Sequence, residues 1–200
     1  MSKHRRYGAF RKKDFLRMAN NTITYLCDEF GYRLKPRLIE TRLEPCVIMM
    51  YSHDNKPGVI YCNYKEFKRL FGDLEYNIQE AIVSGIVAHE VRHYYQHRQI
   101  WAKNPREREE IVERWRQCEE NCVDIRDKMD DEYVLNGLEL DAYLFEYLFI
   151  AHIFDMVLIS LLRDEIHLNA LEKLYIEYYG KTNEKLFGQN VRKTLQMRKS

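Results

Sequence analysis

The chain has 200 residues, 46% of them apolar, and its 32 basic and 31 acidic residues give a net charge of +1. This balance excludes a general electrostatic attraction to nucleic acid or to a membrane surface. Only eight glycines and four prolines are present, which is few for a β-sandwich or barrel. The composition therefore predicts long helices in an α+β fold dominated by helix.

The first third of the chain predicts one helix and a small sheet. Helical periodicity runs from Phe10 to Phe30 and stops at Gly31, a suitable C-cap residue. Three short segments, 37–41, 46–51 and 58–64, are rich in β-branched and aromatic residues and predict strands. Turn-forming residues at 52–58 predict a hairpin between the last two, so the sheet is expected to be antiparallel. A short helix is expected over 65–71.

A long helix is predicted over 74–100. Six residues form one stripe at 3.6 residues per turn: Ile78, Ile82, Gly85, Ile86, His89 and His93. Val83, Val87 and Val91 cover another side. Apolar residues on two sides predict that this helix is central and largely buried.

The remainder of the chain predicts further helices. The run Asn104-Pro105-Arg106-Glu107 is typical of a capping box with proline at the first helical position, followed by a charged helix to about residue 128. Asn136-Gly137 marks a break before an apolar helix over 138–162, whose five ionisable groups exclude a simple membrane span. A last helix is expected over 163–179. Without repeats or linkers, residues 1–200 are predicted to form one domain, with parts 10–64, 74–100 and 104–180 and a basic tail, 181–200.

Cysteine usage and the chain ends predict a cytoplasmic protein. The five cysteines are odd in number and lack the spacing of a disulfide framework. Cys118 and Cys122, four residues apart, could form half a metal site, but reduced thiols are the favoured interpretation. The basic N-terminus has no apolar run behind it, so no signal peptide is expected. The basic ends are interpreted as solvated termini; nucleic-acid binding is not expected, and no pattern specifies an oligomeric state.

The strongest chemical signal is His89-Glu90-Val91-Arg92-His93, an H-E-x-x-H pattern. Residues four apart on a helix point the same way, so His89 and His93 could reach one ion. Glu90 would project to the flank of that pair, where its carboxylate could take a proton from a water bound to zinc. The alternative is a pair of core histidines hydrogen-bonded to other groups.

A catalytic zinc site needs a third protein ligand, and Glu139 is the leading candidate. His97 lies eight residues from His89, about 12 Å along a straight helix, which is too far to share an ion; it is expected to be a surface or second-sphere residue. Glu139 lies on the next buried helix, although it could instead be the third position of a capping box begun by Asn136. Asp141 is rotated about 200° from Glu139, so the two should not both ligate.

Other residues stay open as alternatives. The fallback third ligands are Asp131, Glu132 and Asp141. Tyr133, Tyr143 and Arg92 lie where a transition-state oxyanion could be stabilised. Arg92 could also pair with Asp141 or with another acid.

The H-E-x-x-H helix, followed by Glu139, Ala142 and Phe145 in an E-x-x-A-x-x-F pattern on a later helix, resembles the zincin metallopeptidases of the ImmA/IrrE type, which are bacterial and phage-associated intracellular proteins. The resemblance covers about residues 35–160. It implies a zincin-like fold with a small sheet packed on a central metal-binding helix, His89, His93 and Glu139 as zinc ligands, and Glu90 as base. It also implies that strand 58–64 is an edge strand to which a peptide could add.

These observations predict a zinc-dependent metallopeptidase that hydrolyses a peptide bond in a cytoplasmic protein or peptide substrate. Two other classes stay open. One is a non-catalytic, zinc-stabilised interaction module that docks a partner on its acidic helix over 104–130. The other is a nucleic-acid-associated protein that uses its basic ends.

Overall fold

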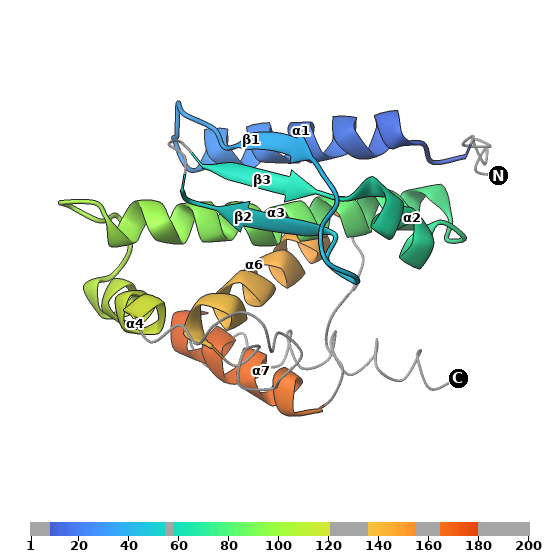
Figure 1. Ribbon diagram of the computed structural model, residues 1–200. Helices are drawn as coiled ribbons and strands as arrows, with labels where there is room; N and C mark the ends of the chain where they lie inside the picture. Colours follow the sequence, from blue (N-terminus) through green and yellow to red (C-terminus); the bar gives the residue numbers. More distant parts are fainter. Residues whose placement is uncertain (1–8, 55–57, 121–135, 155–164, 180–200) are drawn as a thin grey trace. The chain divides into compact units, whose positions relative to one another are not determined.

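The structure is a computed structural model that describes residues 9–54, 58–120, 136–154 and 165–179 (Figure 1). The chain divides into two compact units, Met1–Val91 and Arg92–Ser200. The boundary falls inside helix α3, Tyr76–Ile100, which is continuous across it. Helices dominate and the strands form one small sheet, which confirms the predicted α+β class. That the whole chain is one domain stays a prediction.

The first unit begins with helix α1, Lys12–Glu29, close to the predicted bounds. Gly31 adopts a positive φ of 67°, a conformation that glycine reaches without the steric cost of a Cβ. The N–H groups of Gly31 and Tyr32 donate to the carbonyls of Asp28 and Cys27. These bonds satisfy carbonyls at the end of the helix. The helix therefore ends just before Gly31, as predicted, but the C-cap residue itself is Phe30 and Gly31 is the residue after it.

The sheet contains β1 (Arg37–Glu40), β2 (Met49–Ser52) and β3 (Val59–Cys62) in the order β1-β3-β2. β2 and β3 pair antiparallel, which confirms the predicted hairpin, but β1 pairs with β3 in parallel (Figure 1). The prediction of a purely antiparallel sheet is therefore wrong, and the sheet is mixed. The physical reason is burial: β3 has three buried residues of four and takes the central position, whereas β1 is mostly exposed.

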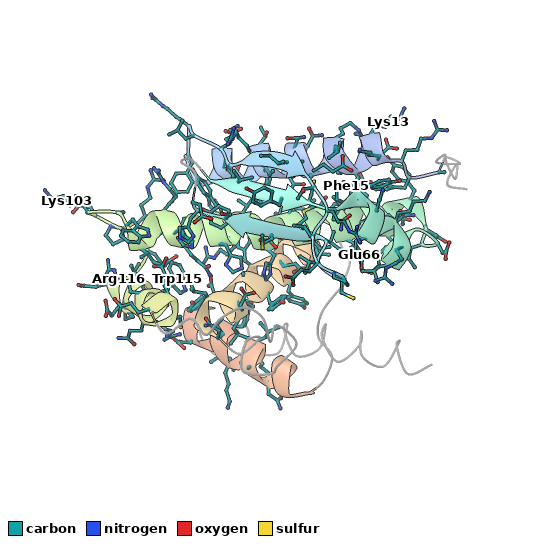
Figure 2. The ribbon with its side chains drawn as sticks, in the orientation of Figure 1. Lys13, Phe15, Glu66, Lys103, Trp115 and Arg116 are labelled. Carbon is teal, nitrogen blue, oxygen red and sulfur yellow. The ribbon has the colours of Figure 1, made fainter. Side chains whose placement is uncertain are left out.

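Aromatic side chains join α1 to helix α2, Tyr64–Phe71, in the first unit. The ring of Phe15, labelled in Figure 2, is fully buried and lies 5.1 Å from Phe67 and 5.5 Å from Tyr64. Phe10 contacts both Phe67 and Tyr76. This cluster ties the N-terminal helix to the start of α3 within the unit.

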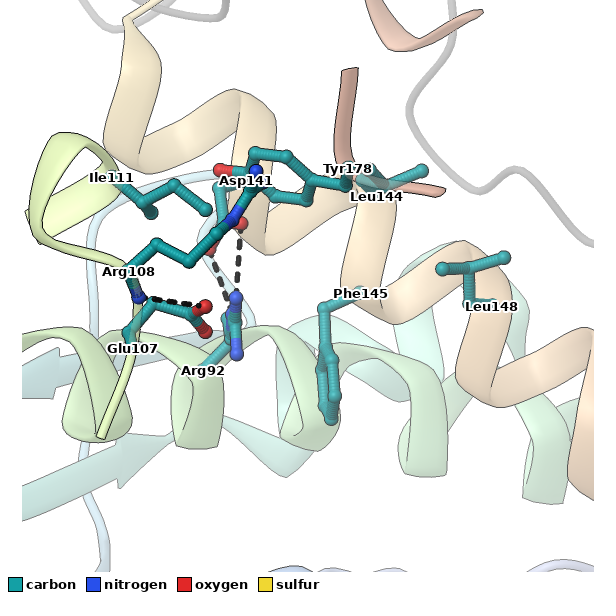
Figure 3. Close-up of a pocket in the computed structure, with 9 residues that line it drawn as sticks. All are labelled: Arg92, Glu107, Arg108, Ile111, Asp141, Leu144, Phe145, Leu148 and Tyr178. Atoms are coloured by element: carbon teal, nitrogen blue, oxygen red, sulfur yellow. Dashed lines mark hydrogen bonds and ion pairs between the residues drawn. The ribbon is translucent and has the colours of Figure 1, made fainter. Parts of the chain in front are cut away.

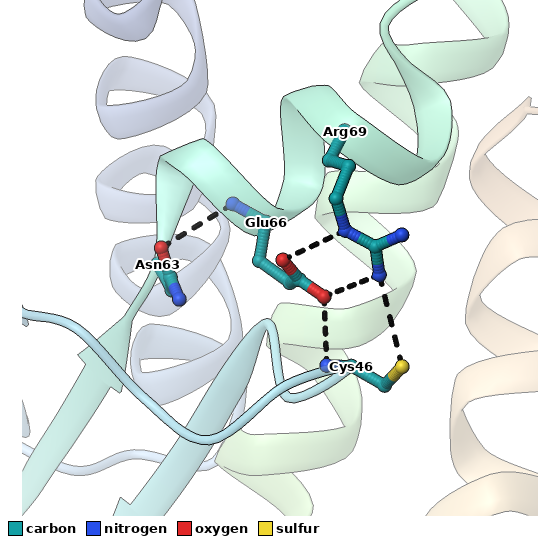
Figure 4. A network of polar contacts seen from close by, with 4 residues as sticks. All are labelled: Cys46, Asn63, Glu66 and Arg69. Carbon is teal, nitrogen blue, oxygen red and sulfur yellow. Dashed lines mark hydrogen bonds and ion pairs between the residues drawn. The ribbon is translucent and has the colours of Figure 1, made fainter.

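A polar network connects the chain before β2 to α2 (Figure 4). Asn63 caps α2 by accepting the N–H of Glu66 at 3.3 Å. The Glu66 carboxylate accepts the backbone N–H of Cys46 at 2.7 Å and Nε of Arg69 at 3.0 Å. Hydrogen bonding from Arg69, and then from Cys46, lowers the pKa of Glu66 to about 2. The network holds Cys46 in a left-handed conformation with φ 67°.

The second unit contains α4 (Glu109–Glu120), α6 (Gly137–Phe154) and α7 (Glu165–Tyr179), besides the end of α3. Its α6–α7 core is built on four buried residues: Leu144, Tyr147, Leu171 and Leu174. Among the described residues, no helix has both the length and the apolar character that a membrane crossing needs. The predicted segments 121–128 and 155–162 lie outside the described residues.

The predicted capping box at Asn104 is wrong, because α4 begins only at Glu109. The backbone N–H groups of Arg106 and Glu107 donate instead to Oε1 of Gln99, at 2.6 and 3.4 Å. This contact comes from the preceding helix, so it holds the segment in a loop where the local sequence favours a helix start.

Candidate metal centre

His89 and His93 lie one turn apart on α3, as the motif predicts. The helix is unbroken from Tyr76 to Ile100, so the two imidazoles project from the same side. Their ligand nitrogens lie within 4.8 Å of each other. His89 is 7% exposed and His93 is half-buried. A pair of histidines this close is suited to share one ion.

Glu139 lies beside His93 in the second unit. Asn136 begins α6 by accepting the N–H of Leu138 on its side chain and the N–H of Leu140 on its carbonyl. The Glu139 carboxylate points to the histidine, with Oε1 at 3.3 Å from Nε2 of His93. Two ligands about 2.0 Å from a tetrahedral zinc ion lie about 3.3 Å apart. The spacing and the nitrogen and oxygen donors therefore fit zinc.

Glu90 is held by the sheet of the first unit. Glu90 is 8% exposed, and its carboxylate accepts the backbone N–H of Tyr51, on β2, at 2.7 Å. The carbonyl of Ile48 accepts the N–H of Asn63 on the β3 side, and N–H groups alternate in direction along a strand. Tyr51 accordingly directs its N–H away from β3. The bond fixes where the Glu90 carboxylate points.

The strand order of the sheet shows that the prediction of which strand lies at the edge is wrong. Residues 58–64 were expected at an edge, but β3 is the central strand, with β1 and β2 on either side. The strand that reaches Glu90 is β2, which among the described residues has only β3 as a neighbour in the sheet. Because a peptide can add only to an open edge, β2 replaces 58–64 as the candidate.

Arg92 confirms its predicted pairing with Asp141. Nε and Nη2 of Arg92 donate to the two carboxylate oxygens at 2.7 and 3.0 Å (Figure 3). Its guanidinium also lies over the rings of Tyr95, Trp115 and Phe145, between 4.7 and 5.3 Å from their centroids. Burial opposes the charge, but the Asp141 carboxylate more than offsets it, so the pKa of Arg92 lies above its ordinary value. Asp141 is thus engaged by Arg92 and is a poor third ligand.

A pocket of about 180 Å³ adjoins this ion pair in the second unit (Figure 3). Its lining combines charged side chains with apolar and aromatic ones. The lining residues are Arg92, Glu107, Arg108, Ile111, Asp141, Leu144, Phe145, Leu148 and Tyr178. Burial, and then the Asp141 charge, raise the pKa of Tyr178, so its hydroxyl stays protonated at neutral pH.

Gln96 was missed in the sequence. It is fully buried and its Oε1 lies 2.8 Å from Nδ1 of His93. Its Nε2 donates to Oδ2 of Asp141 at 2.7 Å and to the carbonyl of Leu138 at 2.9 Å. The available signal was its spacing, since a residue three after a helical histidine lies on the same face.

The other described residues that the sequence singled out lie outside the group formed by His89, His93 and Glu139. His97 lies 3.4 Å from Glu119 through Nδ1 and its side chain is 17% exposed, so it is not an exposed surface residue. A second-sphere role for His97 stays a prediction. Tyr143 packs against the α6–α7 core. Asp131, Glu132 and Tyr133 lie outside the described residues.

The cysteines do not add a thiolate site among the described residues. Burial raises the pKa of Cys27 to about 11 and that of Cys62 to about 12. Both thiols are therefore protonated at neutral pH and are poor zinc ligands. Cys118 is a free thiol, and Cys122 lies outside the described residues.

Comparison with protein-family models, with curated proteins and with solved structures finds no match for this chain. The inference of function consequently depends on the residues of α3, α6 and β2 and on their chemistry.

Proposed function

We propose that this protein is a zinc-dependent metallopeptidase of zincin-like architecture. His89, His93 and Glu139 hold the ion, and Glu90 is the general base for hydrolysis of a peptide bond in an intracellular protein or peptide. The observation that carries the proposal is the 3.3 Å separation of His93 Nε2 and Glu139 Oε1, with His89 one turn away on the face of α3 that bears His93.

The donor set supports zinc over the hard cations. Two neutral imidazoles and one carboxylate are the ligands of many catalytic zinc sites, which keep a fourth position open. Magnesium and calcium prefer sets made of oxygen atoms alone. When bound, zinc lowers the pKa of a coordinated water and polarises the scissile carbonyl.

Glu90 supplies the proton transfer in this scheme. As the residue after His89, it projects beside the histidine pair rather than with it. The Tyr51 N–H holds one carboxylate oxygen, Oε2, at 2.7 Å. The carboxylate can accept a proton from the attacking water and then deliver it to the leaving amine.

The substrate is proposed to bind as an extended strand along β2. The outward N–H of Tyr51 is taken by Glu90, so a peptide backbone would pair with the other outward N–H and C=O groups of β2, which requires no particular side chains. Because Tyr51 on this strand also holds Glu90, a peptide paired with β2 lies beside the base.

Metal content tests the ligands. Purified protein is expected to contain about one zinc per chain by mass spectrometry, and the His89→Ala/His93→Ala double variant is expected to contain none. Glu139→Ala should bind zinc more weakly. A wild-type protein that neither contains zinc nor takes it up on addition contradicts the proposal.

The variant Glu90→Gln tests the base. Glutamine keeps an oxygen for the Tyr51 N–H, so the protein should fold and retain zinc, while cleavage of a peptide library falls by at least about 100-fold. Glu80→Gln, the same change on the same helix, is the control and should cleave normally. Equal cleavage by Glu90→Gln and wild type rules out Glu90 as base.

A further inference from the structure

We infer that Gln96 is a positioning residue that fixes the tautomer of His93, so that Nε2 is the nitrogen offered to a metal. The benefit to metal binding rests on the proposed function. The contact between Gln96 and His93 is itself present in the metal-free protein. All the residues involved lie in the second unit.

The orientation of the Gln96 amide follows from its neighbours. Nε2 lies 2.7 Å from Oδ2 of Asp141 and 2.9 Å from the carbonyl oxygen of Leu138. Both partners are acceptors, and the amide NH₂ has two hydrogens to donate. The flipped amide would place its oxygen against two other oxygens in a fully buried position, which is repulsive. Oε1 must therefore face His93.

The orientation of Gln96 decides the tautomer of His93. Oε1 can only accept a hydrogen bond, and it lies 2.8 Å from Nδ1 of His93. In the neutral ring one nitrogen carries the proton and the other carries the lone pair. Nδ1 consequently bears a proton, whatever the state of Nε2. Nε2 lies 3.3 Å from Oε1 of Glu139, an acceptor that repels a lone pair, so the lone pair on Nε2 is favoured only when a cation lies between the two atoms. That state has its proton on Nδ1 and its lone pair on Nε2. This is the tautomer that a metal bound at Nε2 requires.

Arg92 anchors the same chain of contacts. Its two bonds hold the carboxylate of Asp141, whose side chain is only 1% exposed. Oδ2 of Asp141 accepts both Nε of Arg92 and Nε2 of Gln96. The ion pair thereby fixes the acceptor that orients Gln96, and Gln96 fixes His93.

The first measurement is the tautomer of His93 in the metal-free wild-type protein. Long-range ¹H–¹⁵N NMR spectra, recorded where the ring is neutral and assigned with His93→Gln, distinguish a protonated ring nitrogen from one that carries a lone pair. The expected result is a proton on Nδ1, the nitrogen that faces Oε1 of Gln96. A ring with its proton on Nε2 overturns the inference, whether or not the protein binds zinc.

The second measurement compares Gln96→Leu with Gln79→Leu. Gln79 is buried on the same helix, and its amide donates to the carbonyls of Gly72 and Leu74, so its replacement measures the general cost of removing a buried glutamine. Competition with a chromophoric chelator should show zinc affinity reduced about 10- to 100-fold in Gln96→Leu and unchanged in Gln79→Leu. In Gln96→Leu the ring should also populate the tautomer with the proton on Nε2.

These readouts separate the inference from the proposed function. Absence of zinc from the wild type contradicts the peptidase, while the tautomer still decides the role of Gln96. Gln96→Leu with wild-type affinity and a wild-type tautomer overturns that role. If Gln96→Leu does not fold, as circular dichroism would show, the wild-type spectrum alone decides.

Discussion

The backbone N–H of Tyr51 donates to Oε2 of Glu90 at 2.7 Å, so an edge strand of the sheet holds the proposed catalytic base. The contact lies within the first unit and joins β2 to α3. It connects the strand that we propose as the peptide-binding edge to the carboxylate that we propose as the base.

Removing this N–H should cost stability. Tyr51→Pro deletes the donor while leaving the bonds of β2 to β3, since an outward N–H on an edge strand tolerates proline. The free energy of unfolding should fall by about 1–3 kcal/mol more than in Tyr51→Ala, because a buried carboxylate loses a partner. Denaturant unfolding measures this difference. In a Glu90→Leu background the difference should vanish, and its persistence there would refute the assigned bond.

Breaking the buried ion pair should be more costly than replacing it. Arg92→Leu leaves Asp141 buried without its cation, and the free energy of unfolding should fall by about 3–5 kcal/mol. Arg92→Leu/Asp141→Leu should recover part of that loss, as a double-mutant cycle would show. Arg92→Lys should restore little, because lysine cannot make two parallel bonds or stack on the three rings. Additive single and double effects would show that the pair does not interact.

Acid should weaken the network around Glu66. Its folded pKa, about 2, lies below its ordinary value of 4.5. Its contribution to stability is therefore complete above pH 4.5 and is lost as pH falls toward 2. Urea unfolding across this range should show a steeper loss for wild type than for Glu66→Gln. Arg69→Leu removes the largest cause of the shift and should flatten the profile too; parallel profiles would contradict this assignment.

Cys46→Gly should stabilise the protein modestly. Cys46 has φ 67°, where a residue with a Cβ pays about 1 kcal/mol and glycine does not. The greater freedom of glycine in the unfolded chain offsets part of the gain. Thermal and denaturant unfolding should show a gain below about 1 kcal/mol for Cys46→Gly and none for Cys46→Ala, which keeps the Cβ. A gain shared by both variants would point to loss of the thiol instead.

Local sequence was sufficient for most helices and for the hairpin. These features depend on residues that are neighbours in the chain. They are the helical period of α1 with the glycine after it, the turn residues between β2 and β3, and the long periodic stretch of α3. That Arg92 pairs with an acid could also be anticipated, with Asp141 among the candidates, because a buried charge requires an opposite one. The predicted start of a helix at Asn104 failed because Gln99, a residue outside the segment, takes its backbone N–H groups.

By itself, then, the sequence determined the helix that carries His89 and His93 and the four-residue spacing of the pair, since both follow from periodicity. Only the tertiary structure decided that β3 is central, that Tyr51 holds Glu90 and that Glu139 rather than Asp141 faces His93. It alone revealed Gln96, whose role depends on Asp141, 45 residues away in the chain. The reason is physical: spacing sets which side of a helix a residue occupies, whereas hydrogen bonds between distant elements form only when packing brings donor and acceptor together.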